Sequence, residues 1–196
     1  MCARLADNSY SHYRHVRHPS WCQRLLKKLT TVLVLVFFCL FLSDWLGLRF
    51  NHSQSVAPGF YWVIDKPPEK GDYVSFCPTQ DSLSQMAYGR GYIRFGNCPG
   101  HYERLLKYVV GVTGDTVEIL GQGVSINQSL QPNSTALPYD GIGRPLKPFN
   151  QKLFVLKPNE LWVMTDRSPL SFDSRYFGPI HQNQVSDVVR PLLTWQ

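Results

Sequence analysis

The feature that most constrains this chain is an apolar run near its N-terminus. From Leu29 to Leu48 the sequence reads LTTVLVLVFFCLFLSDWLGL, and its single charged residue is Asp44. These 20 residues match the length that a helix needs to cross the hydrocarbon core of a bilayer. The uncharged part also suits the apolar core of a signal peptide, but no small-residue cleavage site follows it. We therefore predict a retained transmembrane anchor over residues 29–48.

Charge is distributed unevenly on the two sides of this run. Residues 1–28 hold six Lys and Arg side chains against one acid, Asp7, and so carry +5 of the formal net charge of +6. The rest of the chain is close to neutral, which argues against a nucleic-acid partner. Basic residues mark the cytoplasmic side of a span. We predict a cytoplasmic tail over 1–28 and an exported domain over 49–196.

Cysteine usage fits the same division. Three of the five cysteines lie in the tail or in the apolar run, and only Cys77 and Cys98 lie in the exported part. Two cysteines in an oxidising compartment predict a disulfide, which contributes about 3 kcal/mol for a loop of this length. The alternative is a zinc site using Cys77, Cys98 and His101, but a fourth ligand is lacking. We predict no metal and no cofactor.

The exported part is typical of a mainly β domain. Short apolar or alternating segments predict strands over 59–64, 72–77, 104–112, 115–120, 123–127, 152–156, 160–165 and 184–189. The fourth and fifth of these predict a hairpin around Gly121 and Gly123. Residues 79–88 predict a short helix, and residues 131–150, which are rich in Pro and Gly, predict a long surface loop. The expected architecture is a coiled, partly open β-domain behind one transmembrane helix.

Lys107 is the lysine of the exported part best placed for chemistry. No exported histidine lies in a local Ser/His/Asp signature, so nothing local indicates a histidine-based triad. A lysine can activate a serine only when it is neutral, and burial among apolar side chains lowers a lysine pKa. Lys107 has leucines before it and Tyr-Val-Val after it, whereas the other exported lysines lie in turns or at strand ends. The alternative is a solvated lysine on an alternating strand.

Three segments then appear in a fixed order behind the apolar run. They are SQSVAPGFY (53–61), LLKYVVGVTGD (105–115) and SFDSRYFG (171–178). Together they resemble the sequence boxes of the type I signal peptidase family of Ser/Lys proteases. GYIRFGNCPGHYER, which precedes the second segment, and the spacing of Gly59 and Tyr61 from Ser55 are similar to the TraF-type conjugative transfer peptidases, a subfamily of bacterial conjugation systems.

The resemblance implies a role for each site residue. Ser55 would be the nucleophile, Lys107 the general base, Ser53 an oxyanion donor, and Ser171 the partner that orients the lysine. The alternatives are a turn hydroxyl or part of an Asn-His-Ser glycosylation sequon for Ser53, and a turn cap for Ser171.

A second pair is expected behind the lysine. Asp173 and Arg175, spaced i, i+2 as on one face of a strand, predict a pair that supports the site structurally.

Two departures from the family pattern concern the site. The family has proline two residues after the nucleophile, whereas this chain has Ala57 there and Pro58 next. The family's Gly-Asp-Asn-Arg reads Thr-Asp-Arg-Ser over 165–168, so only Asp166 is kept. Beside the serines, the aromatic residues 60–62 predict exposed side chains that rest at the membrane interface.

The function that the resemblance implies is a membrane-bound serine endopeptidase of the bacterial inner membrane with a periplasmic catalytic domain. Its substrate would be a membrane-tethered precursor, the pilin subunit of a conjugative type IV secretion system, and in that subfamily cleavage can be coupled to head-to-tail closure of the pilin. Expected partners are this precursor, the bilayer and other secretion-apparatus proteins. The alternatives are a housekeeping-type signal peptidase I and a non-catalytic scaffold of the secretion apparatus.

Overall fold

The computed structural model describes residues 21–165 and 167–195, and it divides into two units. The first unit ends at Trp45 and the second begins at Leu46. Residues 1–20 of the predicted tail and Asp166 lie outside the described residues.

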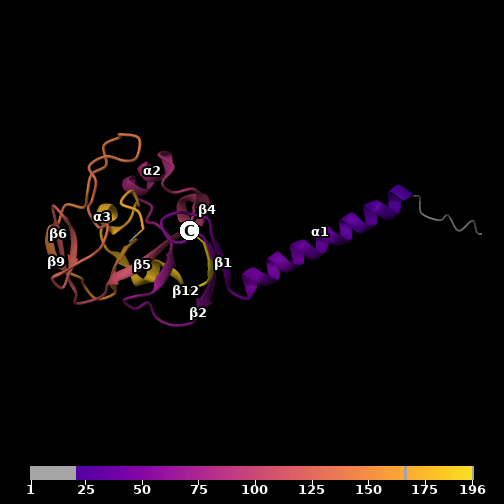
Figure 1. Ribbon diagram of the computed structural model, residues 1–196, viewed down its shortest axis with the longest axis horizontal. Coiled ribbons are helices and arrows are strands. Elements are labelled where there is room, and N and C mark those ends of the chain that lie inside the picture. The colour runs from indigo at the N-terminus through magenta and orange to yellow at the C-terminus, as the bar shows by residue number, and fades with distance from the viewer. Residues whose placement is uncertain (1–20, 166, 196) are drawn as a thin grey trace, which may run out of the picture. The chain divides into compact units, whose positions relative to one another are not determined.

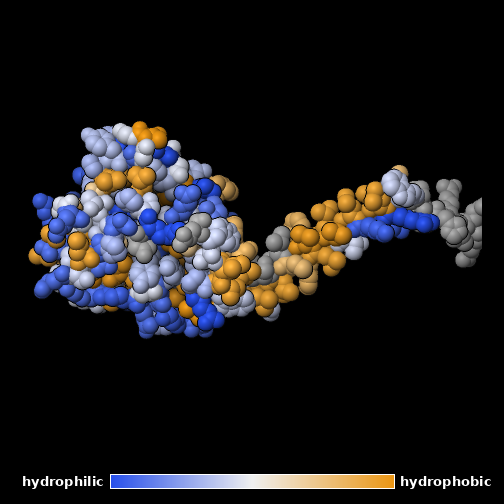
Figure 2. All heavy atoms as spheres, in the orientation of Figure 1, coloured by the Kyte–Doolittle hydropathy of each residue, from blue (hydrophilic) through white to orange (hydrophobic). Residues whose placement is uncertain are grey.

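The first unit is the helix α1 (Trp21–Trp45), which is 25 residues long (Figure 1). Gly47 follows it with a left-handed φ of +88°, and Leu48 already opens the first strand, so the predicted boundary at Leu48 is wrong. Most of the helix surface is hydrophobic, with exposed Leu, Val and Phe side chains (Figure 2). Within residues 21–165 and 167–195, no helix has the combined length and hydropathy expected of a membrane-crossing segment.

The second unit is built on a seven-stranded sheet in which every pairing is antiparallel. Its order is β1-β2-β12-β3-β5-β10-β11. The strands are β1 (Leu48–Asn51), β2 (Gly59–Ile64), β3 (Tyr73–Phe76), β5 (Leu105–Gly111), β10 (Glu160–Met164), β11 (Ile180–His181) and β12 (Val185–Thr194). β2 and β3 follow each other in the sequence but do not pair, because β12 lies between them.

A smaller four-stranded sheet has the order β8-β7-β6-β9. Its strands are β6 (Thr116–Leu120), β7 (Gly123–Ile126), β8 (Ser129–Leu130) and β9 (Leu153–Val155). β6 and β7 form the predicted hairpin, with Leu120 opposite Gly123. Side chains of β6, β7 and β10 form one buried cluster, so the two sheets share a core around Trp162.

The remaining elements are short. They are α2 (Ser82–Gly89), β4 (Phe95–Cys98), α3 (Ser174–Phe177) and the 3₁₀ turns η1 (Pro99–His101) and η2 (Gln182–Gln184). The mainly β class, the eight predicted strands and the helix within 79–88 are confirmed. Residues 131–150 contain no helix or strand, as predicted.

Cys77 and Cys98 form the predicted disulfide, with Cα atoms 5.5 Å apart. Cys77 directly follows β3 and Cys98 ends β4, so the bond ties β4 to the large sheet. Because the two sulfurs are bonded to each other, the alternative zinc site at Cys77, Cys98 and His101 is wrong. Within the described part of the chain, no cluster of three or more His, Cys, Asp or Glu side chains is suited to a metal ion.

Candidate active site

Ser53 and Ser55 lie in the connection between β1 and β2, which runs over residues 52–58. The two strands pair in antiparallel register with Asn51 opposite Gly59, so the serines belong to a hairpin loop closed at its base. A Cβ atom on Gly59 would clash with the backbone carbonyl of Leu193 in β12. Glycine at this position therefore lets β12 close against the base of the serine loop.

Lys107 lies in the middle of β5 on its buried face. The side chains of β5 alternate between buried and half-buried, and Lys107 is on the same side as Leu105 and Val109. Only 3% of its surface is exposed, so the alternative of a solvated strand lysine is wrong. Burial lowers the pKa of Lys107 from 10.5 to about 8, with Asp173 acting to raise it and Arg175 to lower it further.

Ser171 connects the lysine to the serine loop. Lys107 Nζ donates a hydrogen bond to Ser171 Oγ at 2.8 Å. Ser171 Oγ in turn lies 3.4 Å from Ser55 Oγ, to which it donates. Ser171 is itself only 4% exposed. Three residues that are far apart in the sequence thus form one continuous polar chain from a buried amine to a hydroxyl on the loop.

Asp173 and Arg175 do not lie on a strand, so that part of the prediction is wrong. Asp173 is instead the N-cap of α3, where its side chain accepts the backbone N–H of Arg175. The predicted pair is nevertheless present and fully buried. Arg175 Nε donates to Asp173 Oδ1 and Arg175 Nη2 to Asp173 Oδ2, each at 2.8 Å. This two-point geometry is the strong form of a guanidinium–carboxylate contact.

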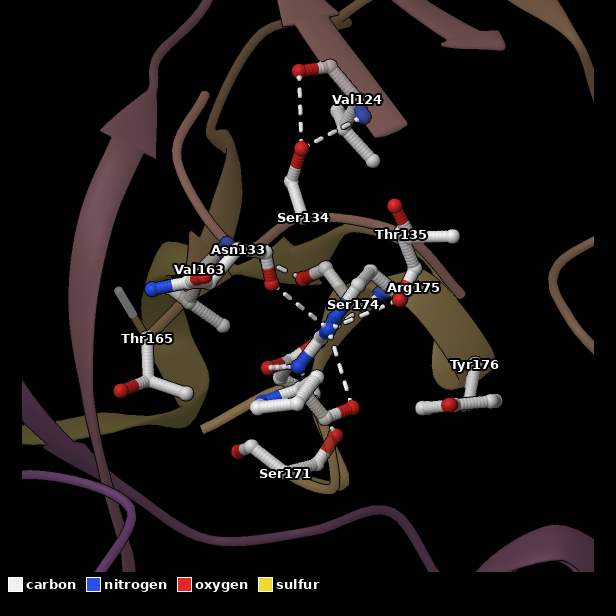
Figure 3. A network of polar contacts seen from close by, with 12 residues as sticks. Val124, Asn133, Ser134, Thr135, Val163, Thr165, Ser171, Ser174, Arg175 and Tyr176 are labelled. Atoms are coloured by element: carbon white, nitrogen blue, oxygen red, sulfur yellow. Dashed lines mark hydrogen bonds and ion pairs between the residues drawn. The ribbon is translucent and has the colours of Figure 1, made fainter. Parts of the chain in front are cut away.

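The guanidinium of Arg175 also donates hydrogen bonds to backbone carbonyl groups of two separate segments (Figure 3). It donates to the backbone oxygens of Asn133, Thr135, Ser168, Pro169 and Ser171. The first two belong to the long loop 131–150 and the others to the segment that carries Ser171. Arg175 therefore fixes Ser171 and one end of the long loop to the same point.

Ser53, Ser55 and Lys107 line one cavity of about 240 Å³. Its apolar wall is formed by Tyr61, Tyr92, Leu105, Leu106, Phe172 and Val189. Polar side chains that also line it include Arg49, His52, Glu103 and Arg104, and His52 Nε2 lies 3.9 Å from Glu103 Oε2. The cavity thus places a hydroxyl and a low-pKa amine beside an apolar surface, which is the arrangement that acyl transfer by a Ser/Lys pair needs.

Two side chains at this site were not expected from the sequence. Tyr61 was predicted to be exposed at the membrane interface, but only 1% of its surface is exposed, and its hydroxyl donates to the carbonyl of Ala57 at 2.6 Å. Thr165 occupies the position of the family's glycine, and its hydroxyl donates to the carbonyl of Ser55. The only available signal was the departure itself, a Thr where the family has Gly.

Comparison with known proteins gives a consistent result. The family model described as signal peptidase, peptidase S26, matches residues 22–193. A plasmid transfer protein TraF of Escherichia coli is 42% identical over 149 residues, which is 76% of this chain and 84% of that protein. A probable conjugal transfer protein TraF of Sinorhizobium fredii is 36% identical over 151 residues, which is 76% of this chain and 78% of that protein.

Among solved structures, a signal peptidase I from Enterococcus faecalis aligns with 64% of this chain and 98% of its own, with 23% identity and a TM-score of 0.39. The family model covers nearly the whole chain, and the TraF proteins are relatives of similar length. The predicted resemblance is thereby confirmed: this chain belongs to the signal peptidase family, peptidase S26.

Proposed function

We propose that this protein is a membrane-bound serine endopeptidase in which Ser55 is the nucleophile and Lys107 the general base. The observation that carries the proposal is the hydrogen-bonded chain from Lys107 through Ser171 to Ser55, with Lys107 and Ser55 lining one cavity. A lysine with a pKa of about 8 is partly neutral near pH 7, so it can accept the proton of a serine.

The chemistry proceeds by acyl transfer. Ser55 Oγ attacks the scissile carbonyl as Lys107 takes its proton, and Lys107 then protonates the leaving amine. The same lysine next activates the water that hydrolyses the ester on Ser55. The Ser55 N–H and the Ser53 hydroxyl, which lines the same cavity, would stabilise the oxyanion, and loss of one such donor costs about 10²–10³ in rate.

The relatives support a substrate class. Proteins named plasmid transfer and conjugal transfer protein TraF are 36–42% identical to this chain. We therefore assign an exported pilin precursor of a conjugation system as the substrate. An amine placed in the cavity attacks the ester on Ser55 in the same way as water, so head-to-tail closure of the product follows the same chemistry. Mass spectrometry distinguishes the two products, because the closed product weighs one water less.

The proposed location is the bacterial inner membrane, with the part of α1 from Leu29 onward as the anchor, residues 1–28 cytoplasmic and the β-domain periplasmic. Supporting this, α1 exposes apolar side chains over most of its length. In the second unit, Phe50, Phe60 and Trp195 form an aromatic cluster with ring centroids 5.2–6.2 Å apart, and Phe50 and Trp195 are exposed. Extraction of membranes at alkaline pH tests the anchor: the full chain should stay in the pellet, and release into the supernatant would contradict it.

The function is tested by precursor processing in membranes. Ser55→Ala and Lys107→Ala should abolish cleavage, while Ser129→Ala and Lys152→Ala, matched substitutions at exposed positions of the small sheet and its edge, should not. Normal processing by Ser55→Ala and Lys107→Ala would favour a non-catalytic scaffold. Cleavage of many unrelated exported precursors would instead favour a housekeeping-type signal peptidase.

A further inference from the structure

Asn51 contacts the serine loop on both sides of Ser55. It is the last residue of β1 and is 8% exposed. Its side-chain Nδ2 lies 3.1 Å from the carbonyl oxygens of Ser53, Val56 and Ala57. Its Oδ1 accepts the backbone N–H of Ser53 at 3.1 Å. One buried amide thus holds the backbone two residues before the candidate nucleophile and at the two residues after it.

Neighbouring donors complete this arrangement. The Tyr61 hydroxyl donates to the Ala57 carbonyl, and the Thr165 hydroxyl donates to the Ser55 carbonyl. Burial raises the pKa of Tyr61 to about 12, so its hydroxyl remains a donor at any working pH. The backbone N–H of Trp195 donates to the carbonyl of Pro58 at 3.0 Å.

These hydrogen bonds account for how the backbone of the serine loop is held in place although residue 57 is not proline. A proline there would fix φ through its ring. Ala57 has no such restraint, and its carbonyl is instead held from outside by Asn51 and Tyr61. The Asn51 amide is suited to this role because one end donates while the other accepts. Aspartate has the same shape but, when ionised, only accepts, so it would turn a carboxylate oxygen toward three carbonyl oxygens.

We propose that Asn51 is a positioning residue that holds Ser55 in the geometry needed to attack the substrate carbonyl. This inference rests on the proposed function. Asn51 lines the same cavity as Lys107, but its side-chain hydrogen bonds all go to the loop backbone, so loss of these bonds should slow acylation.

The test compares the purified full chain in detergent with its Asn51→Asp variant on a precursor peptide. A displacement of about 1 Å at a reacting atom costs on the order of 10²-fold in rate. Asn51→Asp should therefore lower kcat about 100-fold and leave KM within about twofold. Asn183→Asp, an exposed matched control, should leave both unchanged.

A milder variant keeps the test decisive if Asn51→Asp does not fold. Tyr61→Phe removes only the hydroxyl that contacts Ala57, and should lower kcat several-fold at unchanged KM and unchanged melting temperature. Wild-type kcat in Asn51→Asp, or a loss of kcat matched by an equal loss of folded protein in both variants, would overturn the inference. Full activity of Ser55→Ala would instead overturn the proposed function, so the two failures are distinguishable.

Discussion

Lys107 Nζ lies 2.8 Å from Ser171 Oγ, and both side chains are almost completely buried. A hydroxyl can accept a hydrogen bond from an ammonium group, and by rotating its own hydrogen it can donate to a neutral amine. Ser171 can therefore form a hydrogen bond with Lys107 in both protonation states of the amine, without any movement of heavy atoms. In the proposed mechanism Lys107 becomes charged twice in each cycle, and such a base needs a partner of this kind.

The first prediction concerns the pH dependence of processing. In the proposed mechanism the neutral amine is the base. Because the pKa of Lys107 is about 8, kcat/KM should then rise with pH and level off above about pH 8. Measuring kcat/KM on a precursor peptide from pH 6 to 10 checks this. Ser55→Ala should be inactive throughout the range. An acid limb near pH 6.5, the usual histidine value, would argue against Lys107 as the base.

The second prediction is that Lys107 reduces stability at neutral pH. Its pKa is about 8 when folded against 10.5 when unfolded, so between these values the unfolded chain binds more protons. The free energy of unfolding of the wild type should rise with pH across that window, by about 3 kcal/mol in total. Lys107→Met should thus be more stable at pH 7 and lose this advantage by about pH 10.5, as urea unfolding at several pH values would reveal. A difference that does not vary with pH would refute the argument.

The third prediction concerns the buried Asp173–Arg175 pair. Lysine keeps the charge but cannot reproduce the two-point contact or reach the several carbonyl groups that Arg175 holds. Arg175→Lys should lower the free energy of unfolding by about 3–5 kcal/mol, the cost of breaking a buried pair. Chemical denaturation measures this, with exposed Arg94→Lys as the matched control. A loss below about 1 kcal/mol would mean that the network is not essential to the fold.

The fourth prediction concerns the Cys77–Cys98 disulfide. Breaking it should cost about 2–5 kcal/mol, because the reduced unfolded chain gains conformational freedom. Cys77→Ser, Cys98→Ser and the double variant should be destabilised by similar amounts, since each removes the same bond. Thermal unfolding with and without reductant checks this, and reductant should have no effect on the variants. Additive losses in the double variant would show that the two thiols matter separately.

Much of the strand pattern could be predicted from the sequence because alternation and β-branched residues report local burial. β2 begins and ends where the sequence predicts, and the β6–β7 hairpin is marked by its glycines. β1 was missed because its first residue, Leu48, belongs by composition to the apolar run that precedes it. The segment around Asp173 was misassigned because its spacing fits a strand, whereas the carboxylate caps a helix.

The site was predictable only in part, and the reason is physical. Ser55, Ser171 and Lys107 carry chemistry that a sequence motif can suggest. The burial of Lys107 depends on strands β3 and β10, which lie on either side of β5 and come from distant parts of the chain. Asn51 and Tyr61 give no local signal, because asparagine is typical of turns and Tyr61 belongs to an aromatic run that predicts side chains at a membrane interface.

The position of β12 has a consequence for when the protein becomes active. β12 fills the gap between β2 and β3, and the residue after it donates to the carbonyl of Pro58 in the serine loop. Every other strand precedes β12 in the sequence, so during synthesis the loop stays unsupported on that side until residues 185–195 emerge. On the proposed function, a nascent chain would therefore gain a supported serine loop only once β12 has joined the sheet.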